Sequence, residues 1–254
     1  GFDIDNANHL ITAALCEKGK TYYVTGYNDG TEDYTANLTV KTHTHTIKKD
    51  NEDKVKVNKD GTSDEAGGKY ETCTCGYCNY IEYTENYKQI VGTTVKNAVY
   101  TGKALKPAVR IETADGKKLN SKYYTLTYKN NKKIGKGTVT IKFKNGYTGT
   151  VKKTFKINPK ATTAKKVTAG KKQLKATYKK VAGVTGYQVQ VATNKKFTKN
   201  KKTVTVKGVK KTTATVKKLK GGKKYYVRVR TYKVVDGKKY YSAWTKATTT
   251  TVKK

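Results

Sequence analysis

The feature that most constrains this chain is its series of short segments in which Thr, Val and Tyr alternate with other residues. Examples are Tyr124–Tyr128 (YTLTY) and Gly137–Phe143 (GTVTIKF). Successive side chains of a strand point to opposite faces, so this alternation is typical of half-buried strands. Strong turn signals such as Asn28-Asp29-Gly30 and Asp115-Gly116 separate the segments. No stretch has a long helical period or the roughly 20 apolar residues of a membrane span, so the sequence predicts an all-β chain.

Chain length and aromatic content limit the size of the cores that these strands can build. A chain of 254 residues with 35% hydrophobic residues has room for two or three domains. Tyrosine supplies 21 aromatic side chains, against four Phe and one Trp. A Tyr ring packs on a sheet while its hydroxyl stays in water, which favours thin β-sandwiches. We recognise neither a signal peptide nor a wall-sorting motif, so we expect a mature product or a piece of a larger protein.

The net charge of +37 is distributed very unevenly along the chain. Residues 1–90 carry 10 Lys and 15 acidic residues, whereas residues 91–254 carry 45 Lys and Arg against three acids. Those acids are Glu112, Asp115 and Asp236. An acidic head therefore precedes a basic body. Such a body attracts polyanions, although lysines on strand faces and edges also serve simply to prevent aggregation.

Lysine, rather than arginine, makes up almost all of this basic charge. The only arginines are Arg110, Arg228 and Arg230. Arginine is the better residue for bidentate recognition of phosphates and bases, and lysine spread through every strand forms no focused groove. We therefore expect diffuse attraction to anionic cell-wall or host glycan surfaces, and no specific nucleic-acid binding.

Residues 91–158 combine strand patterns with strong turn signals. A strand runs from Val99 into a bend at Pro107, and Thr150–Ile157 forms another strand pattern. The turn motifs resemble those of the immunoglobulin-like repeats of bacterial adhesins; they are Tyr100-Thr101-Gly102-Lys103, Tyr128-Lys129-Asn130-Asn131 and Asn145-Gly146-Tyr147-Thr148-Gly149. The resemblance covers nearly the whole segment. It implies a small immunoglobulin-like sandwich that serves as a spacer in long surface chains.

Residues 161–254 contain the strongest pattern. The strand segments are Leu174–Tyr178, Gly186–Val191, Leu219–Arg230 and Tyr240–Trp244. This stretch resembles the fibronectin type III modules of Gram-positive surface proteins. The resemblance implies a β-sandwich with a tyrosine corner, for which Tyr225 is the candidate, and places Tyr178 where the family often has a core Trp. No Arg-Gly-Asp sequence occurs, so integrin-type adhesion is not expected.

The first 90 residues are expected to form two smaller segments. In residues 1–42, Thr21–Tyr27 and Tyr34–Val40 predict a β-hairpin that belongs to the end of an upstream domain. Residues 43–90 begin with a His-Thr-His sequence and contain Cys73-Thr74-Cys75-Gly76. This second segment resembles a small repeat of clostridial surface proteins with a CxxCG turn, although the turn here is one residue short. The resemblance implies a small Cys/His-containing surface module.

Histidines and cysteines of this module form the only cluster in the sequence with metal-binding potential. His43, His45, Cys75 and Cys78 supply the four N and S ligands of a tetrahedral structural zinc site. The alternative, which a secreted chain favours, is disulfide bonding among Cys16, Cys73, Cys75 and Cys78. Apart from this possible structural zinc, we expect no cofactor.

Catalytic motifs are missing from the sequence. The basic body has three acids and neither His nor Cys, which excludes paired-carboxylate glycosidase chemistry there. No G-x-S-x-G, phosphate loop or dinucleotide fingerprint occurs. We therefore predict that the chain is not an enzyme.

The sequence favours an extracellular, cell-surface or secreted protein of a Gram-positive bacterium, which acts as a structural spacer or adhesin. Two alternatives stay open. One is an accessory region of a secreted enzyme that binds carbohydrate or substrate. The other is a fibre subunit in which the acidic head of one copy contacts the basic body of the next, since head-to-tail contacts give open filaments.

Overall fold

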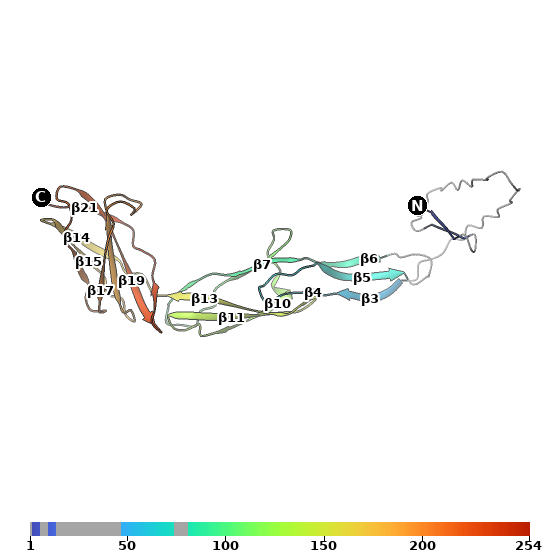
Figure 1. Cartoon of the computed structure of the whole chain (residues 1–254). Helices are drawn as coiled ribbons and strands as arrows, with labels where there is room; N and C mark the ends of the chain where they lie inside the picture. Colours follow the sequence, from blue (N-terminus) through green and yellow to red (C-terminus); the bar gives the residue numbers. More distant parts are fainter. Residues whose placement is uncertain (1, 6–9, 14–46, 74–80) are drawn as a thin grey trace, which may run out of the picture.

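The computed structural model describes residues 2–5, 10–13, 47–73 and 81–254, and strands make up almost all of its regular structure. Figure 1 shows a row of modules: a three-stranded sheet, a central sandwich, and a C-terminal sandwich at the far end. A 3₁₀ turn, η1 (Ser121–Tyr123), is the one helical element in these ranges. None of the described residues belongs to a helix that is long and apolar enough to cross a membrane. The all-β prediction is therefore confirmed.

Two small sheets precede the central sandwich. β1 (Phe2–Asp5) pairs antiparallel with β2 (Leu10–Ala13), whereas the hairpin predicted within residues 21–40 lies outside the described residues. β3 (Ile47–Asp53), β5 (Gly67–Cys73) and β6 (Ile81–Tyr87) form an antiparallel sheet in the order β3-β5-β6. Ile81 and Tyr83 on β6 are 53% and 50% exposed. No second layer of described residues therefore covers these two side chains.

Two sheets form the central sandwich. One has the order β10-β11-β13-β8; its strands are β10 (Tyr124–Lys129), β11 (Gly135–Phe143), β13 (Thr150–Asn158) and β8 (Ala98–Val99). The other sheet pairs β7 (Ile90–Val95) with β9 (Val109–Thr113). Buried and more exposed residues alternate along β11, as its sequence predicts, and Val139, Ile141 and Phe143 lie in the core.

The central core also contains residues that precede the domain boundary expected between residues 90 and 91. β4 (Val55–Lys56) pairs in parallel with β12 (Tyr147–Thr148), and the Val55 amide donates to the Gly146 carbonyl at 2.9 Å. Val55, Val57, Tyr87 and Ile90 are buried in one cluster with the side chains of β11 and β13. Residues on both sides of the expected boundary therefore share one hydrophobic core.

Tyr87 links the three-stranded sheet to the central sandwich. Its hydroxyl donates to Glu52 Oε1 at 2.9 Å, and its ring centroid lies 6.2 Å from that of Tyr123 and 5.7 Å from that of Tyr147. The Tyr123 hydroxyl donates to Glu85 Oε1 at 3.0 Å, which lowers the pKa of this carboxyl. Burial raises the pKa of Tyr87, and it raises the pKa of Tyr147 to about 12.

The C-terminal sandwich has the strand order of a fibronectin type III domain. Its smaller sheet has the order β14-β15-β18, formed by β14 (Ala164–Gly170), β15 (Gln173–Tyr178) and β18 (Thr213–Val216). The larger sheet has the order β17-β16-β19-β20, with β21 also paired to β19; its strands are β17 (Lys202–Lys207), β16 (Gly186–Ala192), β19 (Lys224–Val235), β20 (Lys238–Tyr241) and β21 (Thr248–Thr251). The fibronectin type III-like fold predicted for residues 161–254 is confirmed.

Three buried tyrosines organise this C-terminal core. Tyr225 is 2% exposed, and its hydroxyl accepts the backbone N–H of Lys220 at 3.1 Å, so the predicted tyrosine corner is confirmed. Tyr178, at the position where the family often has Trp, packs against Tyr187 with the ring centroids 4.6 Å apart. The Tyr178 hydroxyl is buried without a hydrogen-bond partner among the described residues, and burial raises the pKa of this side chain.

The two sandwiches contact each other at the linker between them. Pro159 is buried, and the Thr231 hydroxyl donates to the Lys160 carbonyl at 2.8 Å. The end of β19 lies against the central sandwich, where a Cβ on Gly135 would meet Val235 Cγ1 at 3.7 Å. A cleft of about 450 Å³ is lined by residues of both sandwiches, including Ile134 and Val235. The linker is therefore packed against its neighbours.

Candidate functional site

The predicted zinc or disulfide site lies almost wholly outside the described residues. The site residues without a described position are Cys16, His43, His45, Cys75 and Cys78. Cys73 is placed through its backbone, which pairs with Ile47 between β5 and β3. Within the part of the chain that the structure describes, no group of three or more His, Cys, Asp and Glu side chains is suited to a metal ion. Zinc and disulfide both stay predictions.

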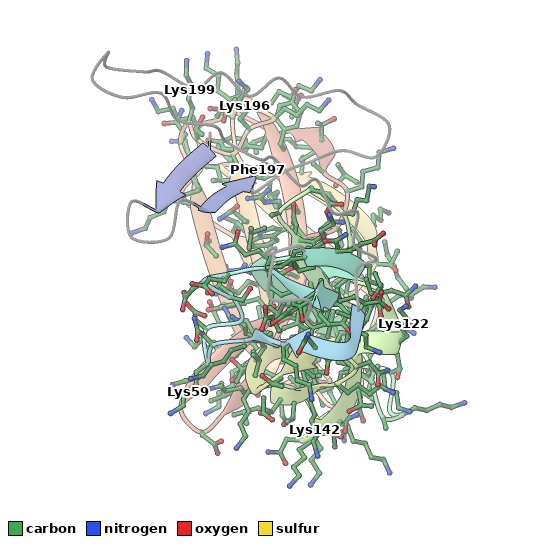
Figure 2. The ribbon with its side chains drawn as sticks, turned by 90° about the vertical axis from the view of Figure 1, so that its right-hand side faces the viewer. Lys59, Lys122, Lys142, Lys196, Phe197 and Lys199 are labelled. Atoms are coloured by element: carbon green, nitrogen blue, oxygen red, sulfur yellow. The ribbon has the colours of Figure 1, made fainter. Side chains whose placement is uncertain are left out.

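Most cations of the basic body have no carboxylate of a described residue nearby. Within residues 91–254, the ion pairs formed with described residues involve Arg110, Lys117 and Lys122. Figure 2 shows lysine side chains projecting from the ribbon on all sides, among them Lys142 and Lys199. A surface with so little compensating negative charge carries a positive potential that attracts polyanions.

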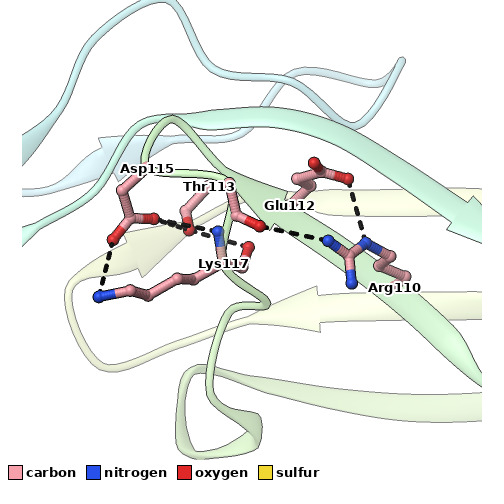
Figure 3. A network of polar contacts seen from close by, with 6 residues as sticks. Arg110, Glu112, Thr113, Asp115 and Lys117 are labelled. Carbon is pink, nitrogen blue, oxygen red and sulfur yellow. Dashed lines mark hydrogen bonds and ion pairs between the residues drawn. The ribbon is translucent and has the colours of Figure 1, made fainter.

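Two of the three acids of the basic body belong to one network beside β9, drawn in Figure 3. Arg110 Nε donates to Glu112 Oε2 at 3.1 Å. Asp115 accepts the Thr113 hydroxyl at 2.6 Å and lies 3.7 Å from the Lys117 ammonium. The hydrogen bond from Thr113 lowers the pKa of Asp115. These carboxylates therefore stabilise a turn of the central sandwich and do not compensate the charge of the C-terminal sandwich.

A pair of arginines on β19, Arg228 and Arg230, forms an ordered cationic group. Strand pairing places Arg228 opposite Gln190 and Arg230 opposite Gln188 on β16. Arg228 donates from Nε and Nη2 to Gln190 Oε1 at 2.9 and 2.6 Å, and Arg230 donates in the same way to Gln188 Oε1 at 2.9 and 2.8 Å.

The two glutamines are themselves fixed by the next strand. Gln188 Nε2 donates to Thr205 Oγ1 at 3.1 Å, and Gln190 Nε2 donates to Thr203 Oγ1 at 3.0 Å. Both acceptors lie on β17, so each hydrogen-bonded chain crosses three strands of the larger sheet. Each guanidinium is therefore held by a side chain that has its own fixed position.

Aromatic rings alternate with the two guanidinium groups. The Arg228 guanidinium lies 3.9 Å from the ring centroid of Phe197 and 4.6 Å from that of Trp244. The Arg230 guanidinium lies 3.8 Å from the ring centroid of Tyr241 and 4.3 Å from that of Trp244. Residues two apart on a strand are separated by about 7 Å, and the Trp244 ring contacts both guanidinium groups. Such contacts are attractive because the ring face is electronegative.

Two further cation–π pairs extend this surface. Lys224 Nζ lies 5.9 Å from the ring centroid of Tyr226, and Lys239 Nζ lies 5.9 Å from that of Tyr232. We call the whole set the cation–aromatic face; it comprises Phe197, Lys224, Tyr226, Arg228, Arg230, Tyr232, Lys239, Tyr241 and Trp244. Six of the seven cation–π contacts found among the described residues belong to it. The cation–π contacts of the described residues are therefore concentrated on one sheet of the C-terminal sandwich.

The irregular segment after β20 holds Trp244 in this position. The Ser242 hydroxyl accepts the Thr231 N–H at 3.0 Å, and the Thr245 hydroxyl accepts the Val229 N–H at 3.0 Å. The amides of Ser242 and Thr245 donate back to the carbonyls of Thr231 and Val229 at 3.1 and 2.8 Å. The hydroxyl groups of Ser242 and Thr245 thus take the place of backbone acceptors beside β19. Because these two residues lie on either side of Trp244 in the sequence, they fix the backbone that carries the indole ring.

This arrangement favours contact with anions over stacking on a sugar ring. Trp244 is the only Trp in the chain, and the guanidinium groups of Arg228 and Arg230 both lie against its ring. Partial burial lowers the pKa of Arg228 and of Arg230 from its ordinary value. Both groups still carry their charge at neutral pH, because an arginine in a protein does not lose its proton there.

Sequence reasoning found the tyrosine corner but missed the cation–aromatic face. The signal was present as two i, i+2 pairs, Gln188 with Gln190 and Arg228 with Arg230, on two strands that a fibronectin-like sandwich places side by side. The register between those strands, which decides that each Arg meets a Gln, is visible only in the folded sheet.

At the other end of the described chain, carboxylates line a groove of about 750 Å³ beside the three-stranded sheet. Its acidic residues are Glu52, Asp53, Asp64 and Glu65. Lys54 and Lys56 also line it, and Lys54 forms an ion pair with Glu52 at 3.4 Å. The groove therefore has an acidic excess, in contrast to the cation–aromatic face.

Comparisons with known proteins add little to these observations. No protein family and no curated protein matches the chain. One similar solved chain, titled "Myokine structure", is 12% identical with a TM-score of 0.30, and the match covers 37% of this chain and 100% of that chain. Another, "Crystal structure of chicken CNTN1 FN1-FN3 domains", is 13% identical with a TM-score of 0.33, and the match covers 74% of this chain and 77% of that chain. The assignment of the fold therefore rests on strand order and register.

Proposed function

We propose that this chain is a non-enzymatic, extracellular spacer and adhesive region of a Gram-positive surface protein, whose basic body binds anionic polymers. The observation that carries the proposal is the uncompensated charge of two consecutive β-sandwiches. They carry 45 Lys and Arg against three acids, two of which stabilise a turn. The row of modules in Figure 1 suits a spacer, because it separates the two ends of the described chain.

Packing at the linker also supports a spacer role. The buried Pro159 and the hydrogen bond from Thr231 to Lys160 limit bending between the two sandwiches. A held linker keeps the attached modules apart more effectively than a flexible one of the same length.

The test is retention of the full chain on immobilised dextran sulfate and poly(glycerol phosphate), with uncharged dextran as the control. We expect retention on both charged polymers at about 50 mM NaCl and release by about 500 mM, because salt screens exposed charges. Equal retention on uncharged dextran, or none on either charged polymer, would contradict the proposal.

A charge-lowered variant makes this test more specific. Four exposed lysines on β11 and β13 can be replaced with Gln: Lys136, Lys142, Lys152 and Lys156. The variant removes four positive charges from the central sandwich and leaves the core residues unchanged. We expect elution at a lower salt concentration, and unchanged elution would show that surface charge does not drive binding.

The acidic groove favours a fibre subunit as a second candidate function. Its excess of carboxylates lies beside the three-stranded sheet, and Figure 1 places that sheet and the C-terminal sandwich on opposite sides of the central sandwich. Contacts between unlike ends of neighbouring copies give open filaments. Sedimentation of the chain alone at low salt, with dissociation at high salt, is the result expected for a fibre; a monomer at both salt concentrations would contradict it.

A further inference from the structure

We propose that the cation–aromatic face is a binding site for a linear polymer carrying phosphate or sulfate ester groups, which lies along β19. This inference rests on the proposed function, and it assigns anion binding to one sheet face of the C-terminal sandwich. The row of cations along this strand begins at Lys224 and continues with Arg228 and Arg230.

Free hydrogen-bond donors on both arginines support the assignment. A guanidinium group has five N–H donors. Arg228 and Arg230 each use Nε and one N–H of Nη2 on a glutamine oxygen, and no described residue accepts from Nη1. The remaining donors suit the paired oxygens of a phosphate or sulfate group.

Both arginines are also held in place before any ligand arrives. Stacking between aromatic rings and hydrogen bonding to the glutamines fix each guanidinium plane. Binding loses less affinity to side-chain ordering when the groups are already immobilised. An exposed lysine such as Lys142 offers the same charge without this preorganisation.

Repulsion within the face favours an anion as its ligand. Arg228 and Arg230 are residues i and i+2 of a strand, with Cα atoms about 7 Å apart, and their guanidinium groups lie 4.6 and 4.3 Å from the same Trp244 ring centroid. No acid of residues 91–254 compensates them, because Glu112 and Asp115 hold the β9 turn and Asp236 lies in the turn between β19 and β20. Like charges at this separation destabilise one another, and a bound oxyanion relieves that repulsion.

Ring geometry distinguishes the expected polymer from a nucleic acid. Single-stranded nucleic acids bind by stacking their bases on open aromatic faces. Here both guanidinium groups already contact the Trp244 ring, and each also lies against Phe197 or Tyr241. A sugar or polyol chain with ester-linked anions can bind through the free N–H donors of the two arginines and the edges of the aromatic rings, and it needs no open ring face.

The test uses the ¹⁵N-labelled full chain, whose three arginines give three Nε–H signals in an NMR spectrum. Arg110, which is paired with Glu112, is an internal control. On addition of poly(glycerol phosphate) or dextran sulfate, we expect the signals of Arg228 and Arg230 to shift while that of Arg110 does not. The polymer that shifts them at the lower concentration identifies the ester that the face prefers.

Other outcomes overturn the inference. Binding without a shift of the two signals, or with equal shifts of all three, means that attraction is diffuse and that the proposed function survives without this site. If neither polymer binds, the proposed function is refuted as well. A stronger response to a single-stranded oligonucleotide assigns the face to nucleic acid, and a shift that depends only on protein concentration assigns it to a second copy.

A pair of matched variants supplies the second measurement. R228K/R230K keeps the net charge but removes stacking and bidentate donors, so we expect affinity to fall about tenfold. K152Q/K156Q removes two charges from exposed positions on β13 and is expected to lower affinity only about twofold. Near-ultraviolet circular dichroism checks that each variant is folded. A folded R228K/R230K variant with wild-type affinity would contradict the site.

Discussion

Replacing Tyr178 with Phe is expected to stabilise the C-terminal sandwich, although it removes a polar group from the packed pair of Tyr178 and Tyr187. Tyr178 is 1% exposed, and its hydroxyl has no hydrogen-bond partner among the described residues. A buried hydroxyl without a partner destabilises a protein by about 1–3 kcal/mol. Part of that gain is offset by the small void left behind, so the expected increase in the free energy of unfolding is about 1 kcal/mol.

Tyr187 provides the matched control, because its ring lies beside that of Tyr178 but its hydroxyl is fully used. It accepts the Val181 N–H at 3.0 Å and donates to the Val209 carbonyl at 3.0 Å. Y187F loses two hydrogen bonds and leaves two backbone groups unpaired, which is expected to destabilise the module by about 2–3 kcal/mol. The two variants remove the same atom and should change stability in opposite directions.

Urea unfolding of the full chain, followed by Trp244 fluorescence, measures both effects. Trp244 is the only Trp, so the signal reports the C-terminal sandwich alone. Y178F should raise the midpoint and Y187F should lower it, with the slope against urea unchanged in both. If Y178F lowers stability by about 1 kcal/mol or more, the Tyr178 hydroxyl has a partner and the reasoning is refuted.

Three further predictions concern the turns and tyrosines of the two sandwiches. Y225F removes the acceptor of the Lys220 N–H and should destabilise the C-terminal sandwich by about 1–2 kcal/mol in the same urea assay; no change would contradict a stabilising corner. The pKa of Tyr147 is raised to about 12 in the folded protein, so as the pH rises the unfolded chain loses this proton first. The contribution of Tyr147 to the free energy of unfolding is therefore full below pH 10 and falls by about 2–3 kcal/mol in total between pH 10 and 12. In calorimetry between pH 10 and 12, Y147F should lose less of its free energy of unfolding than the wild-type protein. An equal loss in both proteins would contradict the assignment of this effect to Tyr147. G146A places a Cβ 2.1 Å from a carbon of the buried Tyr87 ring, at a backbone φ of +87. It should lower the melting temperature far more than the control G116A, whose φ is a similar +75 but whose new Cβ has nothing within 4 Å. Equal effects of the two variants would show that backbone strain alone, and not the clash with Tyr87, determines the loss.

Much of the fold follows from alternation and turn chemistry. Thr150–Ile157 and Gly186–Val191 are strands as predicted, and Asn145 and Gly146 adopt the positive φ values of 53 and 87 that their turn requires. The tyrosine corner was also predicted, from the resemblance to fibronectin type III modules, and its hydrogen bond joins Tyr225 to Lys220, five residues earlier. These features depend on residues that are close in sequence.

Features that depend on the pairing of strands far apart in the sequence could not be predicted from local sequence patterns. Val55 and Val57 stand alone in a polar stretch, and only their pairing beside β12 shows that they belong to the central core. The cation–aromatic face likewise requires the register between β16 and β19, and it requires Phe197 from a separate loop. Local sequence patterns carry no information on either pairing.

The central claim is that the basic body binds anionic polymers through its surface charge, and the most direct test is the affinity for fluorescently labelled poly(glycerol phosphate) as a function of salt concentration. The account predicts that the logarithm of the affinity falls linearly with the logarithm of the NaCl concentration, with a slope of several units, because each neutralised ester group releases counterions. An affinity that does not change with salt, or no measurable binding at about 50 mM NaCl, would contradict it.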